Sequence, residues 1–132
     1  MGEPVGPNEA QISYWNEVTG PKWVAVADLI NAQLAAIGDQ AISLAAPGPG
    51  ERVLDIGCGS GFTAIELDRR VGDAGQVVGL DISKPMLKDA EARAQQAGQG
   101  EIQFVCGDAQ VHVFDGPSFD LLFSRFGVMF FE

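Results

Sequence analysis

The sequence predicts one α/β domain whose strands form a parallel sheet flanked by helices. Short apolar runs alternate along the chain with longer segments in which apolar residues recur at helical spacing. Turn residues, chiefly glycine and aspartate, follow the apolar runs, as they do where the strands of such a sheet end. This alternation favours right-handed β-α-β units. The 132 residues leave room for a single domain with a modest core.

The N-terminal part of the chain is expected to be a flexible segment followed by helices. Residues 1–20 are polar and rich in glycine and proline, and we expect them to be flexible. An amphipathic pattern begins at Pro21 and predicts helices over residues 21–46, with a break at Gly38. A proline–glycine run at 47–50 separates these helices from the first strand.

Two roles are open for the N-terminal helices. The region contains three aromatic residues, Tyr14, Trp15 and Trp23. The helices either cover the ligand cleft as a lid, with one of these side chains near the ligand, or are held on the domain by the same side chains acting as anchors.

Residues 51–132 are expected to hold four strands. Each strand is a short run rich in valine, leucine, isoleucine or phenylalanine. The runs lie near residues 52–57, 77–81, 102–106 and 119–124.

Two helices are expected between these strands, near residues 61–71 and 84–97. Ser83 is the expected N-cap of the second helix, Pro85 fits its first turn, and Gly98 provides a stop. One face of this helix carries apolar residues at helical spacing and is expected to pack on the sheet: Leu87, Ala90, Ala94 and Ala97. The connection between the last two strands contains a Gly-Pro pair and is expected to hold no long helix.

The most informative segment is the turn after the first strand. The strand contains Asp55 and is followed by glycines at alternate positions, Gly57, Gly59 and Gly61. Glycines at this spacing let the backbone turn sharply and approach a ligand closely, and the next helix presents unpaired N–H groups at its start. The junction is therefore predicted to be a small-molecule cradle. An acidic side chain beside it would repel a pyrophosphate but suits a cationic or zwitterionic ligand, which disfavours NAD.

The second strand also ends in an acidic residue. Asp81 lies 24 positions after Gly57 (81 − 57), the distance at which an acidic residue meets a ribose in dinucleotide-binding folds. A carboxylate accepts hydrogen bonds from both ribose hydroxyls at once. The alternative is that Asp81 has only a structural role in the turn before the next helix. The glycines upstream favour the ribose-binding role over this one.

Four motifs in order give the chain a family resemblance. Residues 53–61, 78–87, 104–110 and 119–126 resemble successive motifs of the class I S-adenosylmethionine-dependent methyltransferases. Within that superfamily the chain is most similar to the small-molecule methyltransferases of the ubiquinone/menaquinone-biosynthesis type. The resemblance implies a Rossmann-like sheet of order 3-2-1-4, S-adenosyl-L-methionine as cofactor, and methyl transfer to a small-molecule acceptor.

The resemblance also implies a set of cofactor-binding residues. They are Asp55, Gly57, Cys58, Gly59, Gly61, Asp81, Ile82, Met86, Gly107, Asp108, Ala109 and Ser124. Asp55 and the glycine backbone would face the methionine portion, and Asp81 the ribose. Ile82 and Met86 would cover the adenine face, while Asp108 would accept from the adenine amino group.

The resemblance does not identify a catalytic residue. The single histidine, His112, follows the third strand and is a candidate base because imidazole titrates near neutral pH; the alternative is a solvated or structural histidine. Arg125 either orients an anionic acceptor or pairs with a nearby carboxylate. The backbone around Ser124 would meet the cofactor's amino group.

Composition restricts the partners and the compartment. Eight basic against eighteen acidic residues, a net charge of −10, disfavour nucleic acid and anionic membranes as partners. No signal peptide or membrane-spanning run is evident, and two cysteines without a ligand set predict neither a disulfide nor a metal site. A cytoplasmic enzyme is therefore expected.

The end of the sequence raises a second possibility. The family's sheet has seven strands, and this chain stops just beyond the fourth, so we expect a truncated, cofactor-binding half of the domain. Its fourth strand would be an exposed edge next to a cluster of phenylalanines, and either could support a homodimer. The alternatives are therefore a non-catalytic module that binds the cofactor or dimerises and, less favoured, an NAD-dependent oxidoreductase.

Overall fold

The computed structural model describes residues 8–131, and these form one sheet with helices packed on one of its faces. The sheet has the strand order β3-β2-β1-β4, and every neighbouring pair is parallel. Its strands are β1 (Arg52–Ile56), β2 (Gln76–Asp81), β3 (Gln103–Cys106) and β4 (Leu121–Phe123). The predicted α/β class and the predicted strand order are confirmed.

The register of the sheet brings the functional turns together. Ile56 at the end of β1 lies opposite Leu80, and Asp81 at the end of β2 lies opposite Cys106 at the end of β3. Because all strands run in the same direction, the turns that follow them emerge at one edge of the sheet. The predicted ligand cradle therefore lies at this edge.

One face of the sheet carries the main core. Helices α4 (Phe62–Val71) and α5 (Lys84–Gln96) pack there together with a longer N-terminal helix. The core combines residues of every layer: Ile42, Val53, Ala64, Ile65, Leu67, Val71, Val77, Ala94, Ile102 and Phe123. The other face, around Leu54, Val78 and Leu80, is covered by the irregular connection between β3 and β4, chiefly by Phe114 and Phe119.

Helix α5 begins and ends as the sequence predicts. The Ser83 hydroxyl caps it by accepting a hydrogen bond from the Met86 amide (3.5 Å), and Pro85 lies in its first turn. The helix ends before Gly98, which adopts a φ of 75°. The residues expected to face the sheet are buried except Ala97, which lies beyond the last turn and is exposed.

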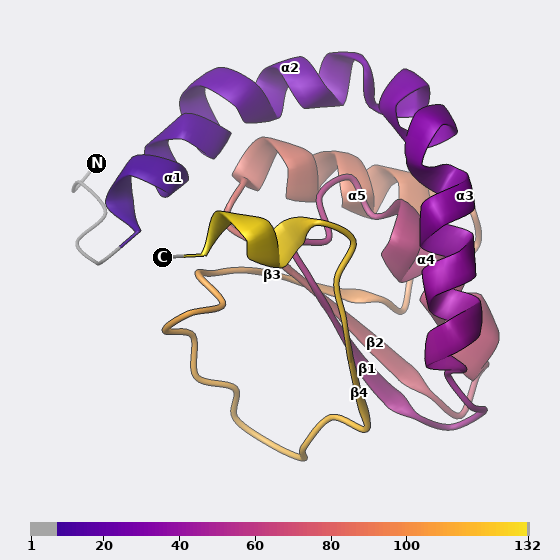
Figure 1. Ribbon diagram of the computed structural model, residues 1–132. Helices are drawn as coiled ribbons and strands as arrows, with labels where there is room; N and C mark the ends of the chain where they lie inside the picture. The colour runs from indigo at the N-terminus through magenta and orange to yellow at the C-terminus, as the bar shows by residue number, and fades with distance from the viewer. Residues whose placement is uncertain (1–7, 132) are drawn as a thin grey trace.

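The N-terminal helices differ from the predicted ones. They are α1 (Glu9–Ser13), a π-helical turn η1 (Tyr14–Val18), α2 (Thr19–Ala25) and α3 (Ala27–Ala45). Figure 1 shows α1 and α2 passing over α5 and the C-terminal 3₁₀ turn η2 (Gly127–Phe130), while α3 descends beside α4. Helical structure thus begins well before Pro21, whereas residues 1–7 of the segment expected to be flexible lie outside the described part of the chain.

The predicted helix break at Gly38 is wrong. Helix α3 runs through Gly38, and the chain breaks instead at Val26, whose φ of −121° and ψ of 21° are not helical. A Cβ at Gly38 would lie 3.1 Å from both Cδ and Nη1 of Arg125. Glycine at this position therefore makes room for a neighbouring side chain and does not end the helix.

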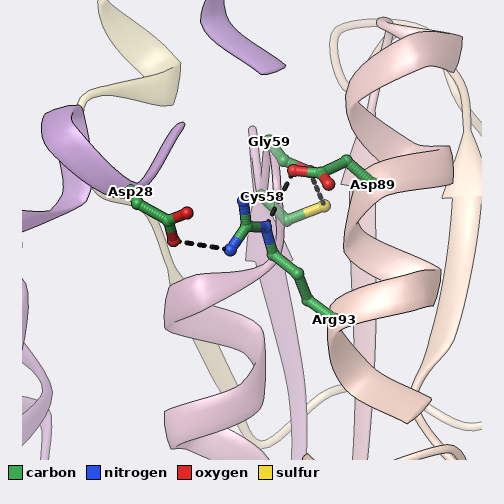
Figure 2. Close-up of polar contacts among 5 residues, drawn as sticks. All are labelled: Asp28, Cys58, Gly59, Asp89 and Arg93. Carbon is green, nitrogen blue, oxygen red and sulfur yellow. Dashed lines mark hydrogen bonds and ion pairs between the residues drawn. The ribbon is translucent and has the colours of Figure 1, made fainter. Parts of the chain in front are cut away.

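Specific polar contacts hold the N-terminal helices on the domain. The Asn16 side chain donates to the Ile82 carbonyl oxygen (2.7 Å), and the Ser83 hydroxyl donates to the Trp15 carbonyl oxygen (2.8 Å). A further link joins α3 to α5: Figure 2 shows Arg93 between Asp28 and Asp89, with N···O distances of 2.8 Å on both sides. These contacts place the helices over the carboxyl edge of the sheet.

Candidate functional site

A cavity of about 150 Å³ lies at the carboxyl edge of the sheet, beneath the N-terminal helices. Its floor is formed by the turns that follow the four strands, and its cover by Asn8, which precedes α1, and by residues of η1, α2 and α3. Most of the residues predicted to bind the cofactor line it: Gly57, Cys58, Gly59, Asp81, Ile82, Met86, Gly107, Asp108 and Ala109. Asp55, Gly61 and Ser124 do not.

The glycine turn is folded tightly against the end of β2. Gly57, Gly59 and Gly61 all have positive φ values of 69°, 55° and 87°. The amides of Gly57 and Cys58 both donate to the Leu80 carbonyl oxygen, at 2.8 and 3.1 Å. A Cβ at Gly61 would lie 2.9 Å from the Cβ of Ala90, so this glycine allows α4 and α5 to pack closely and does not face the ligand.

Asp81 joins the glycine turn to the turn after β2. One of its carboxylate oxygens accepts a hydrogen bond from the Gly59 amide (2.8 Å) and the other from the Ser83 amide (2.9 Å). Burial raises the pKa of Asp81, while these two amides lower it. Each carboxylate oxygen has two lone pairs, so both oxygens can accept a further hydrogen bond from a ligand hydroxyl.

Asp55 lies beneath the cavity. Its side chain is fully buried, and the Thr63 hydroxyl donates to its Oδ2 at 2.6 Å. Its Oδ1 has no hydrogen-bond partner among the described residues. Burial raises the pKa of Asp55 to about 7, although the Thr63 hydroxyl and the charge of Arg125 oppose the shift. Thr63 lines the cavity and Asp55 does not, so the Asp55 carboxyl group is linked to the cavity through its hydrogen bond with Thr63.

The turn after β3 places Asp108 at the cavity and His112 outside it. The Asp108 carboxylate accepts from the Gln110 amide (3.0 Å), which holds the turn in place. His112 does not line the cavity; its ring contacts Phe114 edge-on, with centroids 4.5 Å apart. A Cβ at Gly107 would lie 2.6 Å from His112 Nδ1, so the histidine packs against the outer side of this turn.

The turn after β4 is tied to the end of β1. The Ser124 hydroxyl donates to the Ile56 carbonyl oxygen (2.8 Å) and accepts from the Gly127 amide (3.1 Å). Phe126, at the cavity wall, has a φ of 65°, which is costly for a bulky side chain and is held by these contacts. Ser124 thus shapes the wall without lining it.

Arg125 brings a positive charge to the cavity. Its side chain is half-buried, and Nη1 donates to the Asn31 side-chain oxygen at 3.1 Å. Burial lowers the pKa of Arg125, and the charges of Asp55 and Asp39 raise it. No carboxylate of the described residues lies within 4 Å of its guanidinium nitrogens, so the ion pair that was one of the two alternatives for Arg125 is not formed in this part of the chain.

Aromatic rings form the roof of the cavity. Trp15 contacts Trp23 and Phe130 edge-on, with centroids 5.5 and 5.1 Å apart, and all three line the cavity. Tyr14 contacts Trp15 from outside and is 47% exposed. Of the three aromatic residues considered from the sequence, the two tryptophans therefore reach the cavity.

Sequence reasoning missed several polar and aromatic residues of the site. Asn8, Asn31 and Phe130 line the cavity, and the buried Asn8 Oδ1 has no partner among the described residues. None of the three lies in a recognisable motif. For Asn31 the sequence offers one signal, the amphipathic pattern of α3, because the neighbouring apolar residues Ile30 and Leu34 also line the cavity.

Two further findings concern the described residues as a whole. They contain no group of three or more histidine, cysteine, aspartate or glutamate side chains that could hold a metal ion. None of the helices in residues 8–131 is both long enough and apolar enough to cross a membrane.

Comparisons with known proteins agree with this geometry. Residues 53–132 match the family model described as "Methyltransferase domain". The chain is 36% identical over 94 residues to the aklanonic acid methyltransferase DauC of Streptomyces sp., a match that covers 71% of this chain and 43% of that protein. It is 35% identical over 79 residues to the demethylmenaquinone methyltransferase of Lactococcus lactis, which covers 60% of this chain and 31% of that protein.

Solved structures give the same fold. The whole chain superposes on 57% of a putative S-adenosyl-L-methionine-dependent methyltransferase from Methanococcus maripaludis, with a TM-score of 0.72 and 23% identity. At that identity the match concerns the fold alone. The chain spans less than half the length of the two curated relatives named above.

Proposed function

The chain belongs to the methyltransferase domain family of class I S-adenosylmethionine-dependent enzymes. We propose that it binds S-adenosylmethionine in its cavity and methylates a small, largely apolar acceptor. The observation that carries the proposal is the contact between Gly59 and Asp81. The amide of the glycine turn donates to the carboxylate at the end of β2 (2.8 Å), inside a cavity with apolar walls.

The donor and acceptor groups of the cavity suit the nucleoside half of this cofactor. Asp81 has the lone pairs to accept from two ribose hydroxyls. Ile82 and Met86 provide an apolar surface for the adenine ring, and methionine packs well against aromatic rings. Asp108, on the neighbouring turn, is the acceptor for the exocyclic amino group.

The other half of the cavity suits the methionine portion. The glycine turn and the first turn of α4 border it, with Ser60, Phe62 and Thr63 in its lining. A fully buried Asp55 lies below Thr63, and the ionised form of its carboxyl group, whose pKa is about 7, favours a positively charged group over an anion at this point. S-adenosylmethionine supplies a methyl group on a positively charged sulfur, and its transfer is an in-line displacement.

The roof suits an apolar or aromatic acceptor. Trp15, Trp23 and Phe130 all line the cavity, and Trp15 contacts the other two rings edge-on. Such a surface orients a flat acceptor and excludes water, and orientation supplies much of the acceleration in a displacement. Relatives named for aklanonic acid and demethylmenaquinone support a small molecule of this kind.

Ligand-dependent thermal unfolding tests this function. We expect S-adenosylhomocysteine at about 100 times its Kd to stabilise the chain by about 2.7 kcal/mol, and NADH to have no effect. Turnover with a panel of phenolic, quinone-like and amine acceptors then separates an enzyme from a binding module. Stabilisation by NADH alone would favour an oxidoreductase, and stabilisation by S-adenosylhomocysteine without turnover would favour a non-catalytic module.

A further inference from the structure

We propose that Asn8 determines acceptor specificity by hydrogen bonding to a hydroxyl group of the methyl acceptor. The inference rests on the proposed function, because it assigns one polar group of a ligand of that same cavity. Asn8 lines the cavity and is only 4% exposed. It is one of two asparagines in the cover, and the other, Asn31, already accepts a hydrogen bond from Arg125.

Buried side-chain atoms without a hydrogen-bond partner are concentrated at this cavity. Among the described residues these atoms are Asn8 Oδ1, Asp55 Oδ1 and Ser60 Oγ. Ser60 lines the floor and Asp55 lies beneath it, at the end that the proposed function gives to the methionine portion. Asn8 belongs to the cover. A buried carbonyl oxygen without a partner is unfavourable, and a ligand group that donates to it removes this cost.

Asn8 also stands where an asparagine ordinarily serves its own helix. It is the N-cap residue of α1, and asparagine is among the best N-caps because its side-chain oxygen accepts from an amide of the first turn. Within the described part of the chain the Asn8 side chain makes no such bond. Its backbone carbonyl oxygen accepts from the Ile12 amide at 3.0 Å. The backbone is therefore held in the helix, while the side chain keeps its hydrogen-bonding capacity for a ligand.

The carboxamide of Asn8 suits a hydroxyl group in particular. It carries an acceptor oxygen and a donor NH₂ group, and a half-turn of its terminal torsion exchanges the two. A hydroxyl group can donate as well as accept, so it can pair with either end. Charged groups are less suited, because the side chain is neutral and buried.

The position of Asn8 relative to Trp15 indicates where such a hydroxyl group lies. Trp15 follows Asn8 by seven positions (15 − 8), about two helical turns, and both side chains line the cavity. The ring N–H of Trp15 donates to the Gln11 side-chain oxygen at 3.1 Å, so Trp15 contributes its apolar surface. A flat acceptor beneath this ring would place a substituent on its edge near Asn8.

Two ligands could present a hydrogen-bonding group to Asn8: the acceptor, through a hydroxyl group, or the cofactor, through the amino group of its base. The acceptor is favoured because the floor provides Asp108 for the base, whereas Asn8 lies in the cover with the aromatic rings. The experiment has an arm for each source.

The first arm measures binding of 1-naphthol and 1-methylnaphthalene by equilibrium dialysis, with the chain saturated with S-adenosylhomocysteine. The two probes differ by a hydroxyl and a methyl group of similar size. We expect the affinity ratio of naphthol to methylnaphthalene to fall about two- to tenfold in Asn8→Leu, as the loss of one neutral hydrogen bond implies. Asn8→Asp, which keeps an acceptor oxygen, should retain part of the ratio. Glu9→Gln, an exposed change at the next position, should leave it unchanged.

The second arm compares S-adenosylhomocysteine with S-inosylhomocysteine, whose base carries an oxo group in place of the amino group. We expect Asn8→Leu to leave the affinity ratio of these two nucleosides unchanged. A change in this ratio would assign Asn8 to the base and overturn the acceptor contact. An unchanged naphthol ratio, or no binding of either naphthalene probe, would refute the contact although the proposed function stands. If the wild type binds neither nucleoside, the proposed function fails and the acceptor contact with it.

Thermal unfolding of the unliganded chain separates a ligand contact from a structural role. Asn8→Leu removes a buried oxygen that has no partner among the described residues, so the melting temperature should stay the same or rise. A residue that stabilises the fold would behave in the opposite way. A fall of several degrees in Asn8→Leu, with Glu9→Gln unchanged, would therefore overturn the inference.

Discussion

Asn16 is hydrogen-bonded through both ends of its side-chain amide to the turn that carries Ile82. It donates to the Ile82 carbonyl oxygen at 2.7 Å and accepts from the Lys84 amide at 2.9 Å, and it also donates to the Ile12 carbonyl oxygen in the preceding helix α1. The N-terminal helices are thus attached to the segment that follows Asp81. Docking of the helices and the shape of the nucleoside site therefore depend on the same turn.

Removal of this link is expected to loosen the N-terminal helices. Asn16→Ala deletes hydrogen bonds that each contribute about 0.5–1.5 kcal/mol net, so we expect a loss of about 2 kcal/mol in the free energy of unfolding. Amides of α1 and α2 should exchange faster with solvent, and S-adenosylhomocysteine should bind more weakly. Glu17→Ala, an exposed change in the same turn, is the control. Equal exchange in both variants would contradict the anchoring role.

Gly20 is expected to tolerate no side chain. A Cβ there would lie 1.9 Å from the Trp15 carbonyl oxygen and 2.5 Å from the Ser83 hydroxyl. Gly20→Ala must push α2 away from Trp15 and from Ser83 at the start of α5, which should cost about 1–3 kcal/mol in the free energy of unfolding, as measured by chemical denaturation. Gly100→Ala is the matched control, because the nearest atom to its Cβ would be 3.9 Å away. Similar stability of the two variants would show that the helices do not pack as described.

The buried Asp55 is expected to give the stability a particular pH dependence. Its pKa is about 7 in the folded protein and 3.8 ordinarily, so between those values the folded chain holds a proton that the unfolded chain has lost. Stability should therefore fall as the pH rises from 4 to 7, by at most about 1.4 kcal/mol per pH unit from this group.

Asp55→Asn should remove this contribution. The difference in unfolding free energy between wild type and variant should change across pH 4–7 and stay constant above about pH 8. Asp115→Asn, in the exposed connection before β4, should leave the wild-type slope unchanged. A constant difference between wild type and Asp55→Asn across the whole range would refute the raised pKa.

Ligand binding is expected to change the fluorescence of both tryptophans. Trp15 and Trp23 are the two tryptophans of the chain, and both line the cavity. Trp15→Phe and Trp23→Phe each leave one reporter, so titration with S-adenosylhomocysteine shows which side chain senses the ligand. Unchanged emission in both variants would argue against the lid and favour the role of aromatic anchors.

The residues proposed for the floor of the site could be picked out from the sequence because they lie in short local patterns. Asp81, Asp108 and the glycines each follow directly after a strand, and in a parallel sheet such positions converge whatever the details of packing. Ser83 and Gly98 likewise act on their own helix. These features depend on a few neighbouring residues and can be recognised in a linear pattern.

The cover of the site could not be predicted in the same way. Gly38 suggests a helix break by its propensity, but Gly38 is a site of close approach to Arg125, as Gly20 is to Ser83. Asn31, on α3, lines the cavity and accepts a hydrogen bond from Arg125, which follows β4. Such contacts join residues distant in sequence, and tertiary packing overrides local propensity there. The role of His112 as a base stays a prediction, as does a dimer through β4.

The most direct test of the account is a calorimetric titration of this chain with S-adenosylhomocysteine, with Asp81→Asn and Asp115→Asn in parallel. The account predicts saturable binding to the wild type and to Asp115→Asn. It predicts binding at least about tenfold weaker to Asp81→Asn, whose amide accepts fewer hydrogen bonds from a ribose. Equal affinity for all three proteins, or no binding by a folded wild-type chain, would contradict the assignment of the cavity as the cofactor site.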